Sequence, residues 1–135
     1  ETRVRDPSTM TVVEIHLHVP AGAIPKDGPS AGVALITSLV SLLRRECADG
    51  RVAATGEISL RGRVLPVGGI KSKVLAAARA GIDTVVIPKR NEKDLIEVPD
   101  EIKQQLDIRS AETVEEALAV TLGLGATPPV SKARR

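Results

Sequence analysis

One serine of the sequence, Ser30, lies where its hydroxyl could act as a nucleophile. It follows a tight Gly28-Pro29 loop and comes at the start of a segment that the sequence predicts to be helical. Unpaired N–H groups and the dipole at the start of a helix favour a developing oxyanion. A serine hydroxyl still needs a base to remove its proton. From this local pattern alone, an N-cap serine without a catalytic role is the commoner interpretation.

Histidine is the commonest base, and the sequence contains His16 and His18. Both lie on the same face of a predicted strand, and that strand carries no Asp to orient either ring. Their i, i+2 spacing could also suggest a pair of metal ligands, but no third ligand is evident. We therefore interpret the two histidines as the polar face of a strand, and we expect no metal site.

Two lysines, Lys71 and Lys73, are the other candidate bases. They lie on a predicted helix over residues 70–80, where Ala76 and Ala77 would allow another segment to approach closely. Burial makes a lysine a better base because desolvation disfavours the ammonium form. Both lysines lie about equally far from the centre of the apolar stripe, so helical geometry does not choose between them. A solvated side chain is the commoner interpretation of either one.

A phosphate-binding loop is the rival interpretation of the segment before Ser30. The P-loop pattern requires a Lys after its last Gly, whereas here Gly28 is followed by Pro29, so the pattern fails. Lys26 and Asp27 could orient the loop or contact a substrate, although charges in such loops are more often only solvated.

Strand and helix patterns alternate along the chain and predict an α/β domain (α+β with a mixed sheet). The residues 30–45 are apolar nearly all round, which predicts a largely buried helix whose first turn contains Ser30. Asn91 is predicted to cap a short helix, and Thr113 with Glu116 to form a capping box. The predicted strands are 11–20, 52–54, 84–87 and 108–110, the hairpin is 57–67, and the other helices are 70–80, 99–106 and 113–122.

The composition fits one compact domain, because 135 residues with 42% hydrophobic content can bury a real core. Phe, Trp and Tyr are absent, so the core must be aliphatic and no ring is present to stack on a base. With a net charge of +2, the sequence gives no direct signal of nucleic-acid binding. Cys47 is the only cysteine, which excludes an internal disulfide and favours a reducing, intracellular compartment. No apolar run approaches the about 18 residues of a membrane span.

Three motifs resemble the proteolytic domain of Lon proteases: PKDGPSAG (25–32), TGEISLRG (55–62) and LPVGGIKSKVLAA (65–77). They occur in the order of that family, and the similarity extends over about residues 14–123. The predicted organisation is an N-terminal segment over 1–13 that starts the domain in truncated form, a Lon-type proteolytic domain over 14–124 and a flexible basic tail over 125–135.

The resemblance implies a Ser-Lys dyad. It makes Ser30 the nucleophile and Lys73 the base, and it implies that Thr55 lies near the dyad and Asp27 in the substrate-side loop. The implied activity is that of a serine endopeptidase, which forms an acyl-enzyme and degrades misfolded or regulatory proteins. Backbone N–H groups at the start of the Ser30 helix would hold the oxyanion.

The resemblance also implies partners. The family assembles as hexamers, acts on unfolded proteins or peptides, and carries an AAA+ ATPase module; ATP and Mg²⁺ would belong to that module, and this domain would need no cofactor. Bacterial cytoplasm and mitochondrial matrix both suit such a protein. The alternative is a non-catalytic Lon-protease-like interaction or assembly module of an ATPase. Such relatives lack the serine and the lysine, both of which are present here.

Overall fold

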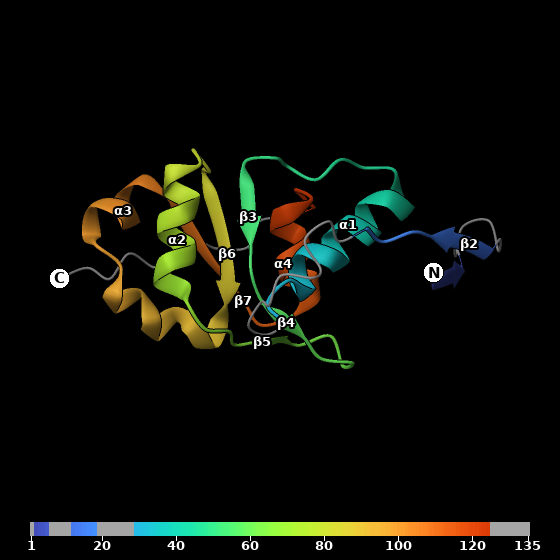
Figure 1. The fold of residues 1–135 in the computed structure, drawn as a ribbon, viewed down its shortest axis with the longest axis horizontal. Helices are drawn as coiled ribbons and strands as arrows, with labels where there is room; N and C mark the ends of the chain where they lie inside the picture. The colour runs from blue at the N-terminus through green and yellow to red at the C-terminus, as the bar shows by residue number, and fades with distance from the viewer. Residues whose placement is uncertain (1, 6–11, 19–28, 125–135) are drawn as a thin grey trace.

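The computed structural model describes residues 2–5, 12–18 and 29–124. Its centre is a parallel sheet of three strands in the order β3-β6-β7, formed by β3 (Val52–Ala54), β6 (Thr84–Pro88) and β7 (Asp107–Ala111). An antiparallel hairpin, β4 (Glu57–Ile58) with β5 (Val64–Leu65), follows β3 directly. The predicted α/β class with a mixed sheet is therefore confirmed (Figure 1).

The central strand β6 is buried on both faces because nearly all its residues are apolar. Successive side chains of a strand point to opposite faces. Val85 and Ile87 accordingly belong to one hydrophobic cluster and Val86 to another. This alternation means that helices must cover both faces of the sheet.

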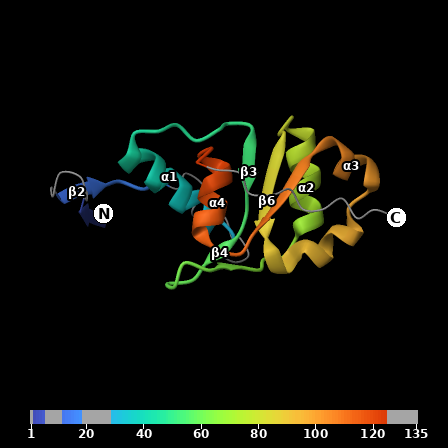
Figure 2. The ribbon, with the colours of Figure 1, turned by 180° about the vertical axis from the view of Figure 1, so that it is seen from behind.

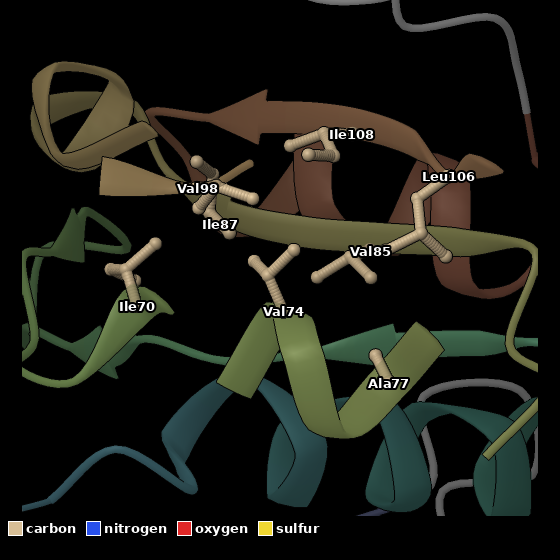
Figure 3. Close-up of a cluster of buried hydrophobic side chains, with 8 residues drawn as sticks. All are labelled: Ile70, Val74, Ala77, Val85, Ile87, Val98, Leu106 and Ile108. Atoms are coloured by element: carbon tan, nitrogen blue, oxygen red, sulfur yellow. The ribbon is translucent and has the colours of Figure 1, made fainter. Parts of the chain in front are cut away.

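One face of the sheet is covered by α2 (Ile70–Arg79), the 3-10 helix η1 (Lys89–Glu97) and α3 (Asp100–Gln105). Ile70, Val74 and Ala77 lie at i, i+4 and i+7 of α2 and are all buried. Figure 3 shows these three side chains pointing toward Val85 and Ile87 of β6. The predicted helix 70–80 is confirmed, and its apolar stripe fixes which way α2 faces.

The opposite face is covered by α1 (Gly32–Arg44) and α4 (Val114–Thr121). Val33 of α1 and Ala117 of α4 are fully buried there, together with Val86 and with Val64 of the hairpin. Thr113 caps α4 by accepting a hydrogen bond from Glu116 N. In a capping box the Glu116 carboxylate would accept from the N–H of the cap residue, Thr113. It accepts instead from the N–H of Glu112, one residue earlier, at 2.7 Å.

Two predictions about α1 are wrong. The helix begins at Gly32, two residues after Ser30, which lies in the preceding turn. Its buried residues are Val33 and Thr37, whereas Leu35 and Leu42 are 38% and 60% exposed. The reason is that α1 contacts α4, β3 and β4 through one stripe, which leaves its outer apolar side uncovered in this structure.

The predicted strand 11–20 is also shorter in the structure. Strand β2 (Val12–Ile15) ends before His16 and pairs antiparallel with β1 (Thr2–Arg5). Figures 1 and 2 both show this pair beyond α1, away from the parallel sheet. None of the helices in the described part of the chain has the length and apolarity needed to cross a membrane.

Candidate active site

The candidate site is built around Thr55, which follows the carboxyl end of β3. Its backbone N–H donates to Val86 O at 3.0 Å and so extends the pairing of β3 with β6. Its side chain is buried, with 7% of the residue exposed. Loops at the carboxyl ends of parallel strands commonly carry functional groups. Thr55 is therefore held rigidly by the sheet at an edge where a site can form.

The turn that contains Ser30 is bound to the residues after β3. The carbonyl oxygen of Ser30 accepts two hydrogen bonds, one from Gly56 N at 3.0 Å and one from Thr55 Oγ1 at 3.3 Å. In return, Val33 N donates to Gly56 O at 3.0 Å. These contacts fix the backbone of the Ser30 turn against the end of β3.

Lys73 reaches the same threonine from the first turn of α2. Its Nζ donates to Thr55 Oγ1 at 3.2 Å, and the side chain is half-buried. Lys71 is exposed. A threonine hydroxyl has one donor and two acceptor lone pairs, so Thr55 can accept from Lys73 and donate to Ser30 O at the same time. The structure thus separates the two lysines, which the helical pattern alone left equivalent.

The link between the Ser30 turn and Lys73 runs through Thr55. Within residues 29–124 no direct hydrogen bond joins Ser30 Oγ to Lys73 Nζ; the amine donates to Thr55 instead. Catalytic hydrogen bonds are often long without substrate and tighten in the productive complex. Ser30 and Lys73 are thus brought to one threonine, and their catalytic roles stay predictions.

The N–H groups at the start of α1 are partly used within the fold. Gly32 N donates to Pro29 O at 3.3 Å, and Val33 N donates to Gly56 O. The Ala31 N–H forms no hydrogen bond with another described residue. A hydrogen-bond donor for an oxyanion would therefore lie in the turn beside Ser30 and not in the helix, which begins only at Gly32.

Asn91 has a role that the sequence pattern did not indicate. It lies inside η1 rather than at its start, so the predicted cap is wrong. The side chain is buried and bonds both backbone groups of Val67, accepting from N at 3.0 Å and donating to O at 2.9 Å. Val67 comes just before Gly68 and Gly69, which lead into α2. Asn91 thereby fixes the entry of the helix that carries Lys73.

A charged group lies at the carboxyl ends of β6 and β7. Lys89 and Ser110 both donate to the carboxylate of Glu92. Burial raises the pKa of Glu92, but the hydrogen bonds from Lys89 and Ser110 outweigh it and leave that pKa below its ordinary value. The hydrogen bond to Glu92 in turn raises the pKa of Lys89.

Other residues singled out in the sequence lie apart from this site or outside the described residues. Asp27 and Lys26 belong to the segment 19–28, which is not described. His16 and His18 follow β2 and are exposed, and Cys47 is exposed as well. Across the ranges 2–5, 12–18 and 29–124, no three His, Cys, Asp or Glu residues gather in a way that could hold a metal ion.

The fold and the site define an α/β domain in which a serine-bearing turn and a lysine-bearing helix meet at one threonine. The family model of the Lon protease (S16) C-terminal proteolytic domain matches residues 1–123. The chain therefore belongs to that family, as the three sequence motifs predicted.

Curated relatives agree with this assignment. Lon protease 1 of Bdellovibrio bacteriovorus is 58% identical over 111 residues, which is 82% of this chain and 14% of the relative. Lon protease of Geobacter metallireducens is 58% identical over 116 residues, 86% of this chain and 14% of the relative. Lon protease of Clostridium beijerinckii is 59% identical over 111 residues, 82% of this chain and 14% of the relative. The chain thus spans about one seventh of the length of these proteins.

Proposed function

We propose that this domain is the serine-type endopeptidase part of an ATP-dependent protease, with Ser30 as the nucleophile and Lys73 as the general base. The observation that carries the proposal is the shared contact at Thr55. Lys73 Nζ and the Ser30 carbonyl oxygen bind the same hydroxyl, at 3.2 and 3.3 Å. The turn that carries the proposed nucleophile and the side chain of the proposed base therefore contact the same hydroxyl, and membership of a family of proteolytic domains supports the proposal.

The proposed reaction begins when the neutral amine of Lys73 takes the proton of Ser30 Oγ. The oxygen attacks the carbonyl carbon of a peptide bond and forms a tetrahedral oxyanion. As the C–N bond breaks, the Lys73 ammonium gives its proton to the leaving amine, and Ser30 holds the acyl group as an ester. Lys73 then takes a proton from water, and the hydroxide attacks the carbonyl carbon of the ester. The C–Oγ bond breaks, the carboxylic acid product leaves, and Ser30 Oγ recovers the proton from the Lys73 ammonium.

Thr55 orients Lys73 in this scheme, and backbone N–H groups beside Ser30 stabilise the oxyanion. The N–H groups of Ser30 and Ala31 both donate to no other described residue. Asp27, in the segment before Ser30, would lie on the substrate side of the site.

The remaining parts of the proposal concern the longer protein. The matched segment makes up 14% of each of the three relatives, which leaves ample chain for an ATPase module that binds ATP and Mg²⁺. We expect a homo-oligomer, such as a hexamer, that degrades unfolded or regulatory proteins. Light scattering on the full-length protein tests the assembly.

A serine-directed covalent inhibitor tests the catalytic role against the alternative of a non-catalytic interaction module. We expect a fluorophosphonate to modify Ser30 in the full-length protein, as located by peptide mass mapping, and to react far more slowly with the Lys73→Met variant. Ser38, which is exposed and donates to Ala34 O, is the internal control. Modification of Ser38 as fast as Ser30 would favour the interaction module.

A further inference from the structure

We propose that Gly56 is a positioning residue for the nucleophile. It must lack a side chain because its backbone forms the hydrogen bonds that hold the Ser30 turn in place. The inference rests on the proposed function, since it concerns the geometry of the same site. It assigns to the first glycine of the TGEISLRG motif a role separate from that of its neighbour Thr55.

The backbone of Gly56 contacts the nucleophile segment at two places, Ser30 and Val33. Its N–H donates to Ser30 O at 3.0 Å, and its carbonyl oxygen accepts from Val33 N at 3.0 Å. The preceding residue, Thr55, receives the hydrogen bond from Lys73. Adjacent residues of one turn thus hold the nucleophile segment and the base, so a shift of this turn changes the separation of Ser30 and Lys73.

No room exists for a side chain at this position. A Cβ on Gly56 would lie 2.8 Å from Val33 Cγ2 and 2.8 Å from Val64 Cγ1, closer than real Cβ atoms approach. Val33 and Val64 are 0% and 6% exposed, so neither has open space into which to move. The φ of Gly56 is 155°, which L side chains rarely adopt.

The opposite side of the contact is equally close. A Cβ on Gly32 would lie 3.0 Å from Ile58 N and 3.1 Å from Gly56 O, both of them backbone atoms that cannot rotate away. Glycine on both sides therefore allows the start of α1 and the turn after β3 to approach closely enough for backbone hydrogen bonds to form between them. The two glycines come from different motifs, PKDGPSAG and TGEISLRG.

A methyl group at position 56 must displace Val33, Val64 or the turn itself. Val33 lies three residues after Ser30 on the same helix start, so its displacement moves the nucleophile relative to Thr55 and Lys73. A misplacement of about 1 Å at a reacting centre can lower a rate about 100-fold. The loss falls on kcat, because the alignment of nucleophile and base matters in the transition state, while KM changes little.

The test compares Gly56→Ala with matched variants in the full-length protein, using a fluorogenic peptide substrate. Gly50→Ala is the control for the substitution itself, because a Cβ there meets nothing within 4 Å. Val85→Ala is the control for stability, since it opens the hydrophobic cluster on the α2 face without touching the Ser30 turn. Ser30→Ala, run beside them, reports on the proposed function by itself.

We expect Gly56→Ala to lower kcat about 100-fold with KM within about twofold, and to change the pH profile of kcat/KM. Gly50→Ala and the folded fraction of Val85→Ala should keep the wild-type kcat and pH profile. Adding Val64→Ala to Gly56→Ala should restore part of kcat, because it removes one of the two clashing methyl groups. A wild-type kcat in Gly56→Ala, or the same loss per folded molecule in Val85→Ala, would overturn the inference.

A Gly56→Ala protein that does not fold still leaves the inference testable from the opposite side. Gly32→Ala places a Cβ at 3.0–3.2 Å from its neighbours, a milder conflict at the same contact. We expect it to fold and to lose at least about tenfold in kcat, and a wild-type kcat would overturn the inference. Activity that survives Ser30→Ala would instead contradict the proposed function, so the two failures are distinguishable.

Discussion

Lys73 Nζ donates a hydrogen bond to Thr55 Oγ1 at 3.2 Å, although the two residues lie on opposite sides of the β4–β5 hairpin in the chain. The same hydroxyl donates to Ser30 O. A helix, a strand end and a turn are thereby joined by one side chain. The relationship places the predicted base and the predicted nucleophile turn around a common oxygen atom, and the following predictions depend on it.

Thr55→Val should lower peptide cleavage about 2- to 10-fold, because it removes the hydrogen bond that orients Lys73, and such bonds contribute about 0.5–1.5 kcal/mol. Thr55→Ser keeps the hydroxyl and should retain most of the activity. Thr37→Val is the matched control: Thr37 is equally buried and bonds Val33 O and Thr121 Oγ1, away from Lys73. Steady-state kinetics should show a loss for Thr55→Val alone, and an equal loss in Thr37→Val would argue against the role of Thr55.

Lys73→Met should lower cleavage by at least about 100-fold, which is the contribution expected of a general base. Methionine keeps the length and the apolar stem of the side chain, so the packing of α2 changes little. Lys71→Met, two residues earlier on the exposed side of α2, should stay within about twofold of wild type. The reverse order of the two activities would transfer the role of base to Lys71.

Asn91→Ala should lower the free energy of unfolding by about 1–3 kcal/mol, because the N–H and the carbonyl of Val67 both lose their partner. Asn91→Asp should also be destabilised, since a carboxylate cannot donate to Val67 O and would lie beside Asp94. Lys93→Ala, at an exposed position of the same 3-10 helix, serves as the control. Denaturant unfolding gives the values, and wild-type stability of Asn91→Ala would show that the bonds to Val67 are not needed.

The stability of the domain should depend on pH through Glu92. Its pKa is lowered in the folded state, so its ionised form stabilises the fold above the unfolded pKa of about 4.3, and this contribution is lost as pH falls through the folded pKa. Unfolding curves measured from pH 7 to pH 3 should fall more steeply for the wild type than for Glu92→Gln. Parallel curves for the two proteins would mean that the bonds from Lys89 and Ser110 contribute nothing.

Local sequence patterns were sufficient to predict an element where its apolar residues follow a single helical or strand pattern. The stripe of Ile70, Val74 and Ala77 predicted α2, and the apolar run at 84–87 predicted β6 with an error of one residue. The motifs led to the correct family. The domain boundaries and the roles of Asp27, Thr55, Ser30 and Lys73 stay predictions.

Contacts between distant residues were not predictable from local pattern. Asn91 and Val67 are 24 residues apart, and nothing near Asn91 indicates that its amide replaces a backbone partner. The clash at Gly56 likewise depends on Val33 and Val64, which belong to other elements. The apolar outer side of α1 predicted burial, but Leu42 is 60% exposed, because the helix packs against α4, β3 and β4 through the stripe that holds Val33 and Thr37.

Ser30 is the proposed nucleophile, and peptide cleavage by the full-length Ser30→Ala variant is the decisive measurement of that role. Ser41→Ala is the control, because Ser41 lies on α1, the helix that follows the Ser30 turn, and its hydroxyl donates to Glu46 O rather than to a residue of the site. We expect the degradation of an unfolded protein to fall to background in Ser30→Ala and to stay at the wild-type rate in Ser41→Ala. Full cleavage by a correctly folded Ser30→Ala variant would contradict it.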